Sequence, residues 1–234
     1  MERLDKLVAN QFNITRSEAR AAIRRGRVTV DGAVVRIADH KASGEANSIC
    51  LDGNAMNYRK FMYIVMNKPA GVLSASKDKN SETVIDLIPN DIKRRGLFCV
   101  GRLDKNTTGL LLITDDGDFS HKLMAPDKEI YKTYIAELDG DIPPNLSDAF
   151  LMGVTLADGT VCRPAKLTKI GERTAELKIC EGRYHQVKRM FGVYSLGVNS
   201  LKRVAIGGFF LPEELAEGEA RELTVDELKI LKNL

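Results

Sequence analysis

One carboxylate in this chain stands in a setting where it could do chemistry. Asp104 lies in a polar stretch, residues 101–109, that an apolar run follows directly. Arg102 and Lys105 lie within two residues of it. A carboxylate held among cations stays ionised, which suits a nucleophile or a base better than a general acid. An ordinary loop aspartate that makes an Asx turn would have the same spacing, so both interpretations of Asp104 stay open at this point.

A second group of polar side chains follows at residues 181–191. Arg183, His185, Lys188 and Arg189 occur close together there. If a helix spans residues 184–194, the last three of these share one face and apolar side chains form another. Such a face could contact RNA, but a solvated surface helix and a histidine with ordinary hydrogen bonds would give the same pattern.

Two tyrosines and several missing motifs narrow the chemistry further. Tyr131 and Tyr134 lie in a strand-like segment and point to opposite faces, so at least one ring can face a cleft unless both only pack in the core. No glycine-rich phosphate loop is present, which disfavours a nucleotide cofactor. The four cysteines lie far apart and only three histidines accompany them, so neither a disulfide framework nor a metal site is expected.

Positive charge is concentrated in two parts of the chain. Residues 1–27 carry seven Lys or Arg against three acids, and residues 182–203 carry five with no acid. Because neutralisation of phosphates supplies much of the affinity for nucleic acids, RNA or DNA is the favoured class of partner. A solvated charged surface is the alternative.

The first basic zone has the signals of a short helix. Thr15 and Glu18 have the spacing of a capping box, and Gly26 stands where a helix commonly ends, which predicts a helix over about residues 16–25. Four arginines would line one side of this helix and its end, beside an apolar packing face: Arg16, Arg20, Arg24 and Arg27. Guanidinium groups suit forked contacts with phosphate oxygens, so this arginine row is predicted to follow an RNA backbone.

The other elements predict two domains. Residues 53–60 are mostly polar and lack periodicity, so we expect a linker there, with a small helical and β module at 1–59 and a larger domain at 60–234. In the larger domain, helices are expected at 84–87, 118–123, 144–152, 184–194 and 225–231, and strands at 61–66, 97–100, 109–114, 131–138, 162–170, 174–180 and 201–206. Strands and helices do not alternate regularly, which favours an α+β fold with a mixed, mainly antiparallel sheet.

Size and hydropathy complete the expectations from composition. A chain of 234 residues can bury a core of its own, and its longest apolar runs fall far short of the roughly 20 residues of a membrane-spanning helix. We therefore expect a soluble, cytoplasmic monomer with no membrane partner.

One long string resembles a known family at nearly every position. It begins Gly101-Arg102-Leu103-Asp104, continues to Gly117, and resembles the signature of the ribosomal pseudouridine synthases. The segments 67–71, 132–134, 181–190 and 201–207 fall in the order that this family shows. Residues 3–32 resemble the small RNA-binding module first described in ribosomal protein S4. Together the two resemblances cover almost the whole chain.

The resemblance implies isomerisation of uridine in ribosomal RNA without metal or cofactor. The C1′–N1 bond is broken, the uracil turns, and C5 bonds to C1′. Asp104 matches the reactive aspartate of the family, which would act as a nucleophile at C1′ or as a base at C2′; the sequence does not choose between these roles.

The resemblance also assigns roles around Asp104. A uridine in structured RNA has to leave its stack, and Arg102 and Tyr134 match the positions that occupy the gap and stack on the uracil. Lys188 matches the position whose cation pairs with the aspartate, where many relatives have arginine. Arg183 is expected to contact RNA.

The substrate is predicted from residues 184–188. They resemble members that act on small-subunit (16S) rRNA, because large-subunit members more often carry Asn-Arg-Gln-Ile-Arg there. Small-subunit rRNA, free or in an assembling particle, is therefore expected, with large-subunit (23S) rRNA as the alternative. A non-catalytic RNA-binding protein of ribosome assembly and a glycosidase that releases free uracil are the other readings. The presence of Asp104 argues against the first, and strand scission at an abasic site would reveal the second.

Overall fold

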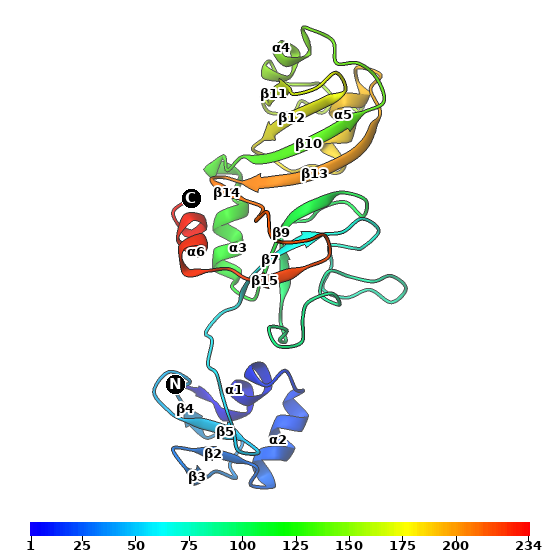
Figure 1. The fold of residues 1–234 in the computed structure, drawn as a ribbon. Helices are drawn as coiled ribbons and strands as arrows, with labels where there is room; N and C mark the ends of the chain where they lie inside the picture. Colours follow the sequence, from blue (N-terminus) through cyan, green and yellow to red (C-terminus); the bar gives the residue numbers. More distant parts are fainter. The chain divides into compact units, whose positions relative to one another are not determined.

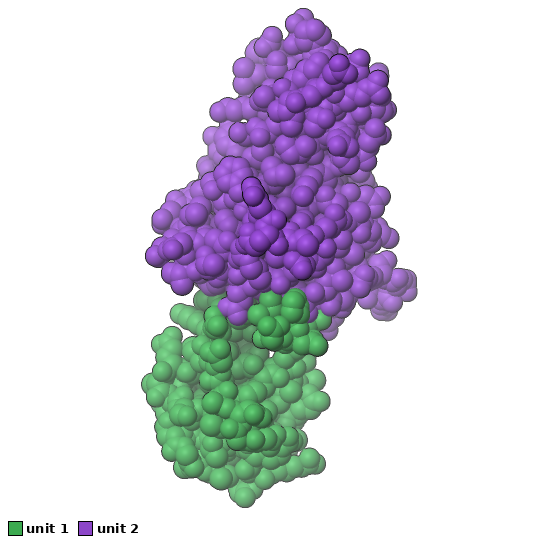
Figure 2. All heavy atoms as spheres, viewed as in Figure 1, with its two compact units in different colours: residues 1–62, 89–97 green, residues 63–88, 98–234 purple.

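The computed structural model describes all 234 residues, which form two compact units (Figures 1 and 2). The first unit comprises residues 1–62 and 89–97, and the second comprises residues 63–88 and 98–234. The first stretch ends near the expected linker, but the sequence pattern does not anticipate that residues 89–97 return to it. Within the first unit, the Arg94 guanidinium donates to the carbonyl oxygens of Arg59 at 2.6 Å and Lys60 at 3.2 Å. None of the helices has the length and apolar content that a membrane crossing requires.

The first unit packs two short helices on small sheets. Its elements are β1 (Glu2–Arg3), α1 (Leu4–Gln11), α2 (Arg16–Arg24), β2 (Val28–Val30), β3 (Ala33–Val34), β4 (Lys41–Ala42), β5 (Ile49–Leu51) and β6 (Asn54–Ala55). The predicted capping box is present: the Thr15 hydroxyl accepts from the Glu18 amide, and the Glu18 carboxylate accepts from the Thr15 amide at 2.6 Å. Leu4, Val8 and Ile23 are fully buried, so one face of each helix closes the core.

The second unit is built on one large sheet. Its strands are β7 (Tyr63–Lys68), β8 (Phe98–Val100), β9 (Thr108–Thr114), β10 (Lys132–Leu138), β11 (Lys166–Lys169), β12 (Thr174–Ile179), β13 (Val198–Ile206), β14 (Phe209–Phe210) and β15 (Ala220–Glu222). Its helices are α3 (Gly117–Met124), the short 3₁₀ turn η1 (Pro126–Lys128), α4 (Leu146–Leu151), α5 (Gln186–Gly192) and α6 (Val225–Lys232). The strand order is β11-β12-β10-β13-β9-β7-β15, with β14 on β13 and β8 on β9. Only β9 and β13 pair in parallel, which confirms the mixed, mainly antiparallel α+β fold.

Two predicted helices differ from the structure. Residues 84–87 form turns, because Asp86 accepts hydrogen bonds from the Thr83 amide and hydroxyl and holds the chain in a local turn. The helix predicted at 184–194 begins only at Gln186, since His185 adopts a left-handed backbone conformation (φ 46°, ψ 35°). The strands β14 and β15 have no counterpart among the predicted strands.

Strand β9 fixes the position of the loop that carries Asp104. Residues 110–113 are almost completely buried, as expected for a central strand covered on both faces. At the start of the strand, Gly109 (φ 97°) lies against β13, where a Cβ atom would stand 2.2 Å from the carbonyl oxygen of Arg203. Only glycine permits this approach. The loop before β9 is thereby held next to β13.

Candidate active site

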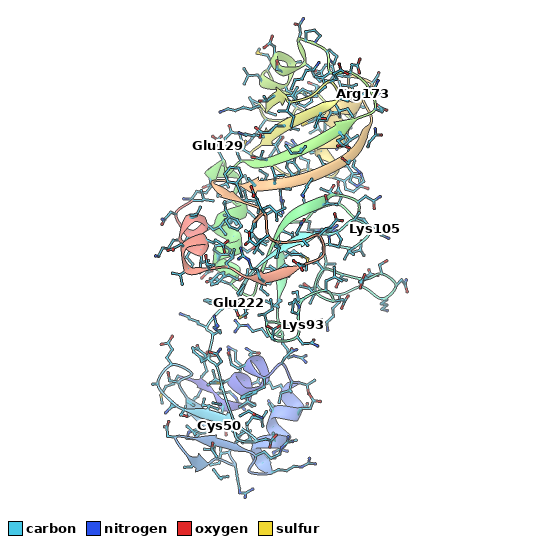
Figure 3. All side chains as sticks on the ribbon, viewed as in Figure 1. Cys50, Lys93, Lys105, Glu129, Arg173 and Glu222 are labelled. Carbon is cyan, nitrogen blue, oxygen red and sulfur yellow. The ribbon has the colours of Figure 1, made fainter.

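A cavity of about 660 Å³ opens in the second unit. Its walls come from the loop before β9, the facing side chains of β10 and β13, and the segment that leads into α5. Figure 3 labels Lys105, which lies on this loop next to Asp104 in the sequence. Four residues to which the family resemblance gives a role line the cavity: Arg102, Asp104, Tyr134 and Arg183. The structure therefore brings together segments that are about 80 residues apart in the chain.

The Asp104 carboxylate has few partners. Its side chain is 31% exposed, and its only ion-pair contact is with the His185 Nε2 atom, 3.7 Å from Oδ1. This distance exceeds that of a hydrogen bond. The backbone of Asp104 is nevertheless held, because its carbonyl oxygen accepts from the Thr107 amide at 3.0 Å. A carboxylate on a fixed loop, with lone pairs free beside a cavity, can act on a bound molecule as a nucleophile or as a base.

His185 and Tyr184 form one wall of the cavity. Their rings stack with centroids 3.9 Å apart, and Tyr184 is 76% exposed. Because His185 has positive φ, the chain turns immediately before α5 and directs the imidazole toward Asp104. The sequence left His185 open between a member of an RNA-contacting face and a histidine with ordinary hydrogen bonds. Its left-handed conformation has no signal in the pattern of side chains.

Of the cationic face predicted for residues 185–189, only Lys188 and Arg189 lie in α5, because His185 precedes the helix. Arg189 pairs with Asp158 at 2.5 Å, outside the cavity lining. Lys188 neither lines the cavity nor makes an ion pair with Asp104. Val187 points into the cavity from the first turn of α5, and the next residue of a helix points about 100° away. His185 is the side chain that reaches Asp104 in this structure.

A buried lysine supports the Asp104 loop. The Lys68 ammonium, at the end of β7, donates to the carbonyl oxygens of Pro69 (2.9 Å), Lys105 (2.9 Å) and Thr107 (3.1 Å). Burial lowers the pKa of Lys68 to about 8, partly offset by the negative charge of Asp104. The Lys68 ammonium thus holds the carbonyl oxygens of two chain segments, the end of β7 and the loop before β9, next to each other. Lys68 falls in the family-like segment 67–71, but the sequence alone gives it no role.

The arginine row lies in the first unit and is organised by Asp5, for which the sequence pattern gives no role. Asp5 is fully buried and accepts hydrogen bonds from Arg3, Arg16 and Arg20, the closest at 2.9 Å from the Arg20 Nε atom. Burial alone would raise the pKa of Asp5, but these hydrogen bonds outweigh it and hold the pKa far below its usual range. Of the rest of the row, Arg27 pairs with Asp52 and Arg24 is exposed.

Comparisons with known proteins identify both units. Residues 62–192 match the family model of RNA pseudouridylate synthase, and residues 2–47 match that of the S4 domain. The chain is 39% identical to an uncharacterized RNA pseudouridine synthase, YtzG, of Bacillus subtilis over 98% of each chain. It is also 39% identical to ribosomal small subunit pseudouridine synthase A of Escherichia coli, over 97% of this chain and 98% of that one.

A solved structure agrees with these matches. A crystal structure of a pseudouridylate synthase superimposes with a TM-score of 0.69 at 36% identity, covering 99% of this chain and 100% of that one. The matched region contains the whole loop of Asp104, most of the cavity wall and all of α5. The chain therefore belongs to the RNA pseudouridine synthase family and carries an S4 domain ahead of its synthase domain.

Proposed function

We propose that this pseudouridine synthase isomerises a specific uridine of small-subunit (16S) ribosomal RNA and that Asp104 is its reactive carboxylate. The role of Asp104 is supported by its carboxylate, which lines the cavity, has one contact at 3.7 Å and keeps lone pairs free for a substrate. The substrate class is supported by near full-length similarity to proteins named ribosomal small subunit pseudouridine synthase A.

In the reaction, the target uridine leaves its stack and enters the cavity. Tyr134 is buried beneath the cavity and offers a ring on which the uracil stacks, and Arg102 occupies the gap in the RNA. Asp104 attacks C1′ or removes the C2′ proton, the C1′–N1 bond breaks, the uracil turns, and C5 bonds to C1′. None of these steps needs a metal or a cofactor.

Cations outside the reacting atoms hold the RNA. Arg183 lines the cavity mouth, where its exposed side chain can meet a phosphate, and the arginine row of the first unit follows the backbone. Lys188 acts as the cation beside Asp104 only if its side chain turns toward the cavity when RNA binds. The enzyme works on rRNA in the cytoplasm as a monomer.

The test is to map pseudouridine in 16S and 23S rRNA from cells with and without this chain. We expect one position of 16S rRNA to lose its modification and to regain it with the wild-type gene but not with Asp104→Asn. A missing modification in 23S rRNA would instead select the large-subunit alternative. No change in either rRNA would overturn the proposal, and abasic scission of the RNA by the purified protein would indicate a glycosidase.

A further inference from the structure

The wall of the cavity that faces the uracil carries two buried cations for which the protein supplies no anion. Lys132 is 6% exposed and Arg203 is 2% exposed, and both line the cavity. The Arg203 Nε atom donates to the Leu110 carbonyl oxygen at 2.8 Å, while its Nη2 atom is buried without a partner. The Lys132 ammonium has neither a hydrogen-bond acceptor nor a carboxylate. Uncompensated buried charge is costly, so it marks a place where something anionic is expected to bind.

The sheet directs both cations to one point. Lys132 and Tyr134 lie two residues apart on β10 and therefore on the same face. Arg203 is the direct partner of Tyr134 on β13, the strand that runs beside β10 in Figure 1. Cross-strand partners share a face, so the two cations lie around the ring on which the uracil stacks.

A bulge in the sheet creates this arrangement. The register of β10 and β13 shifts between Thr133, opposite Ala205, and Tyr134, opposite Arg203. Val204 is the extra residue on β13; without this register shift, Tyr134 would pair with Val204 instead of Arg203. Bulges of this kind re-aim a side chain. The two positive groups are also close enough to oppose each other: burial first, and then the charge of Arg203, lowers the pKa of Lys132.

We infer that Lys132 and Arg203 form a receptor for the uracil anion released when the C1′–N1 bond breaks. This inference rests on the proposed function, but it holds for either role of Asp104. If the carboxylate attacks C1′, a C1′–O bond forms; if it removes the C2′ proton, a C1′–C2′ double bond forms. In both cases the electron pair of the C1′–N1 bond goes to N1 and spreads over O2 and O4.

The receptor stabilises the anion more than the neutral base, which is the condition for a faster reaction. It also keeps the detached uracil in the cavity while the base turns. C5 then bonds to C1′, the carboxylate regains its electron pair or returns its proton to C2′, C5 loses its proton, and N1 gains one. The negative charge on the base is thereby discharged, and the neutral product leaves the two cations.

The test compares two leaving groups in two variants. Lys132→Met keeps the length of the side chain and removes its charge, and Lys132→Arg keeps the charge. Each protein is mixed in excess with small-subunit rRNA transcribed with uridine or with 5-fluorouridine, whose base departs as a more stable anion. The rate of C1′–N1 cleavage is followed by chromatographic separation of the nucleosides after digestion, because substrate and product have the same mass. RNA affinity is measured by filter binding, and folding by thermal unfolding. Lys202→Met, on the opposite face of β13, is the matched control.

We expect Lys132→Met to slow the single turnover of uridine RNA about 10²-fold, the usual loss when one preorganised donor to a developing anion is removed. With 5-fluorouridine RNA the loss should be several times smaller, and RNA affinity should stay within about twofold because the cost arises in the transition state. Lys132→Arg should recover part of the rate, and Lys202→Met should match the wild type.

Three results would overturn the inference. Equal losses with both bases would mean that Lys132 only supports the fold of the site. A loss of RNA affinity with an unchanged single-turnover rate would mean that it binds an RNA phosphate. A wild-type rate in Lys132→Met would mean that no anion is held there. These outcomes all require an active wild-type enzyme, so they differ from failure of the proposed function, in which the wild type itself forms no pseudouridine in 16S rRNA.

Discussion

Each unit of this protein holds an aspartate among cations, and the two carboxylates are used in opposite ways. Asp5 is fully buried and accepts five hydrogen bonds from three arginines. Asp104 is 31% exposed and has one contact, at 3.7 Å, with a histidine. The first has no lone pair left for a substrate and serves to orient guanidinium groups. Cationic neighbours therefore do not identify a reactive carboxylate; unused hydrogen-bonding capacity beside a cavity does.

The largest effect is expected from Asp104→Asn. The amide can neither attack C1′ nor remove a proton, so single-turnover formation of pseudouridine should fall by at least about 10³-fold. Since the carboxylate has no hydrogen-bonded partner to lose, the free energy of unfolding should change by less than about 0.5 kcal/mol. Substantial turnover by Asp104→Asn, or a marked loss of its stability in urea, would mean that Asp104 is a structural carboxylate like Asp5.

Asp5→Asn should have the reverse profile. Removing a buried charge from three hydrogen-bonded cations destabilises the first unit by about 1–3 kcal/mol, less than for a fully buried pair because the arginines reach solvent. Urea unfolding of the full chain, followed by a probe in the first unit, measures this loss. At saturating RNA, kcat should stay unchanged while KM rises, because the arginine row loses its order. A lower kcat would show that Asp5 acts on the chemistry.

The pH dependence of stability sharpens the contrast. The pKa of Asp5 is lowered in the folded unit, so the unfolded chain binds more protons once the pH falls below about 4, the ordinary pKa of aspartate. The stability that Asp5 provides is complete above that pH and is lost below it. The difference in the free energy of unfolding between wild type and Asp5→Asn should therefore become smaller as the pH is lowered below about 4. A constant gap would mean that the carboxylate charge contributes nothing.

The same sign is expected at higher pH for Lys68, the cation beneath the Asp104 loop, although here the charged form costs stability instead of providing it. Its pKa is lowered to about 8 in the folded state, whereas an unfolded lysine titrates near 10.4. Between these values the unfolded chain binds more protons, so wild-type stability should gain up to about 1.4 kcal/mol per pH unit relative to Lys68→Met. Parallel urea titrations at pH 7, 8, 9 and 10 give the difference in the free energy of unfolding between wild type and Lys68→Met. A flat difference would mean that Lys68 titrates normally.

The sequence predicted the sheet and much of the cavity because both depend on local patterns. The apolar run of β9 and the polar loop before it were readable as strand and turn. The local pattern left Asp104 open between a reactive carboxylate and an Asx-turn residue, and only the family resemblance assigned it a role. The five hydrogen bonds of Asp5 were not readable, because one acid in a basic segment looks like a solvated charge. The role of Lys68, which lies in the family-like segment 67–71, was not predicted for a related reason: its three acceptors are backbone carbonyls, two of them about 40 residues away, which no side-chain pattern displays.

Backbone conformation explains the remaining differences. A helical period of apolar residues placed the start of α5 at Tyr184, but the left-handed conformation of His185 delays it by two residues. His185 therefore lies before the helix, and its imidazole is the side-chain group that contacts Asp104. β15 was missed because a three-residue strand with two charged side chains becomes a strand only by pairing with β7, about 150 residues earlier.

The smallest effect distinguishes the arginines that Asp5 holds from the one that it does not. Arg24 is exposed and makes no side-chain ion pair, so Arg24→Ala should leave stability unchanged and remove one phosphate contact. The slope of log affinity against log salt should then fall by about 0.7 to 0.9, measured by RNA binding between 50 and 200 mM salt. Arg20→Ala should lower the slope similarly but also destabilise the first unit by about 1 kcal/mol, because Asp5 loses a donor. If Arg24→Ala leaves the slope unchanged, the RNA path follows only the arginines that Asp5 orients, and the ordered part of the row is the binding surface.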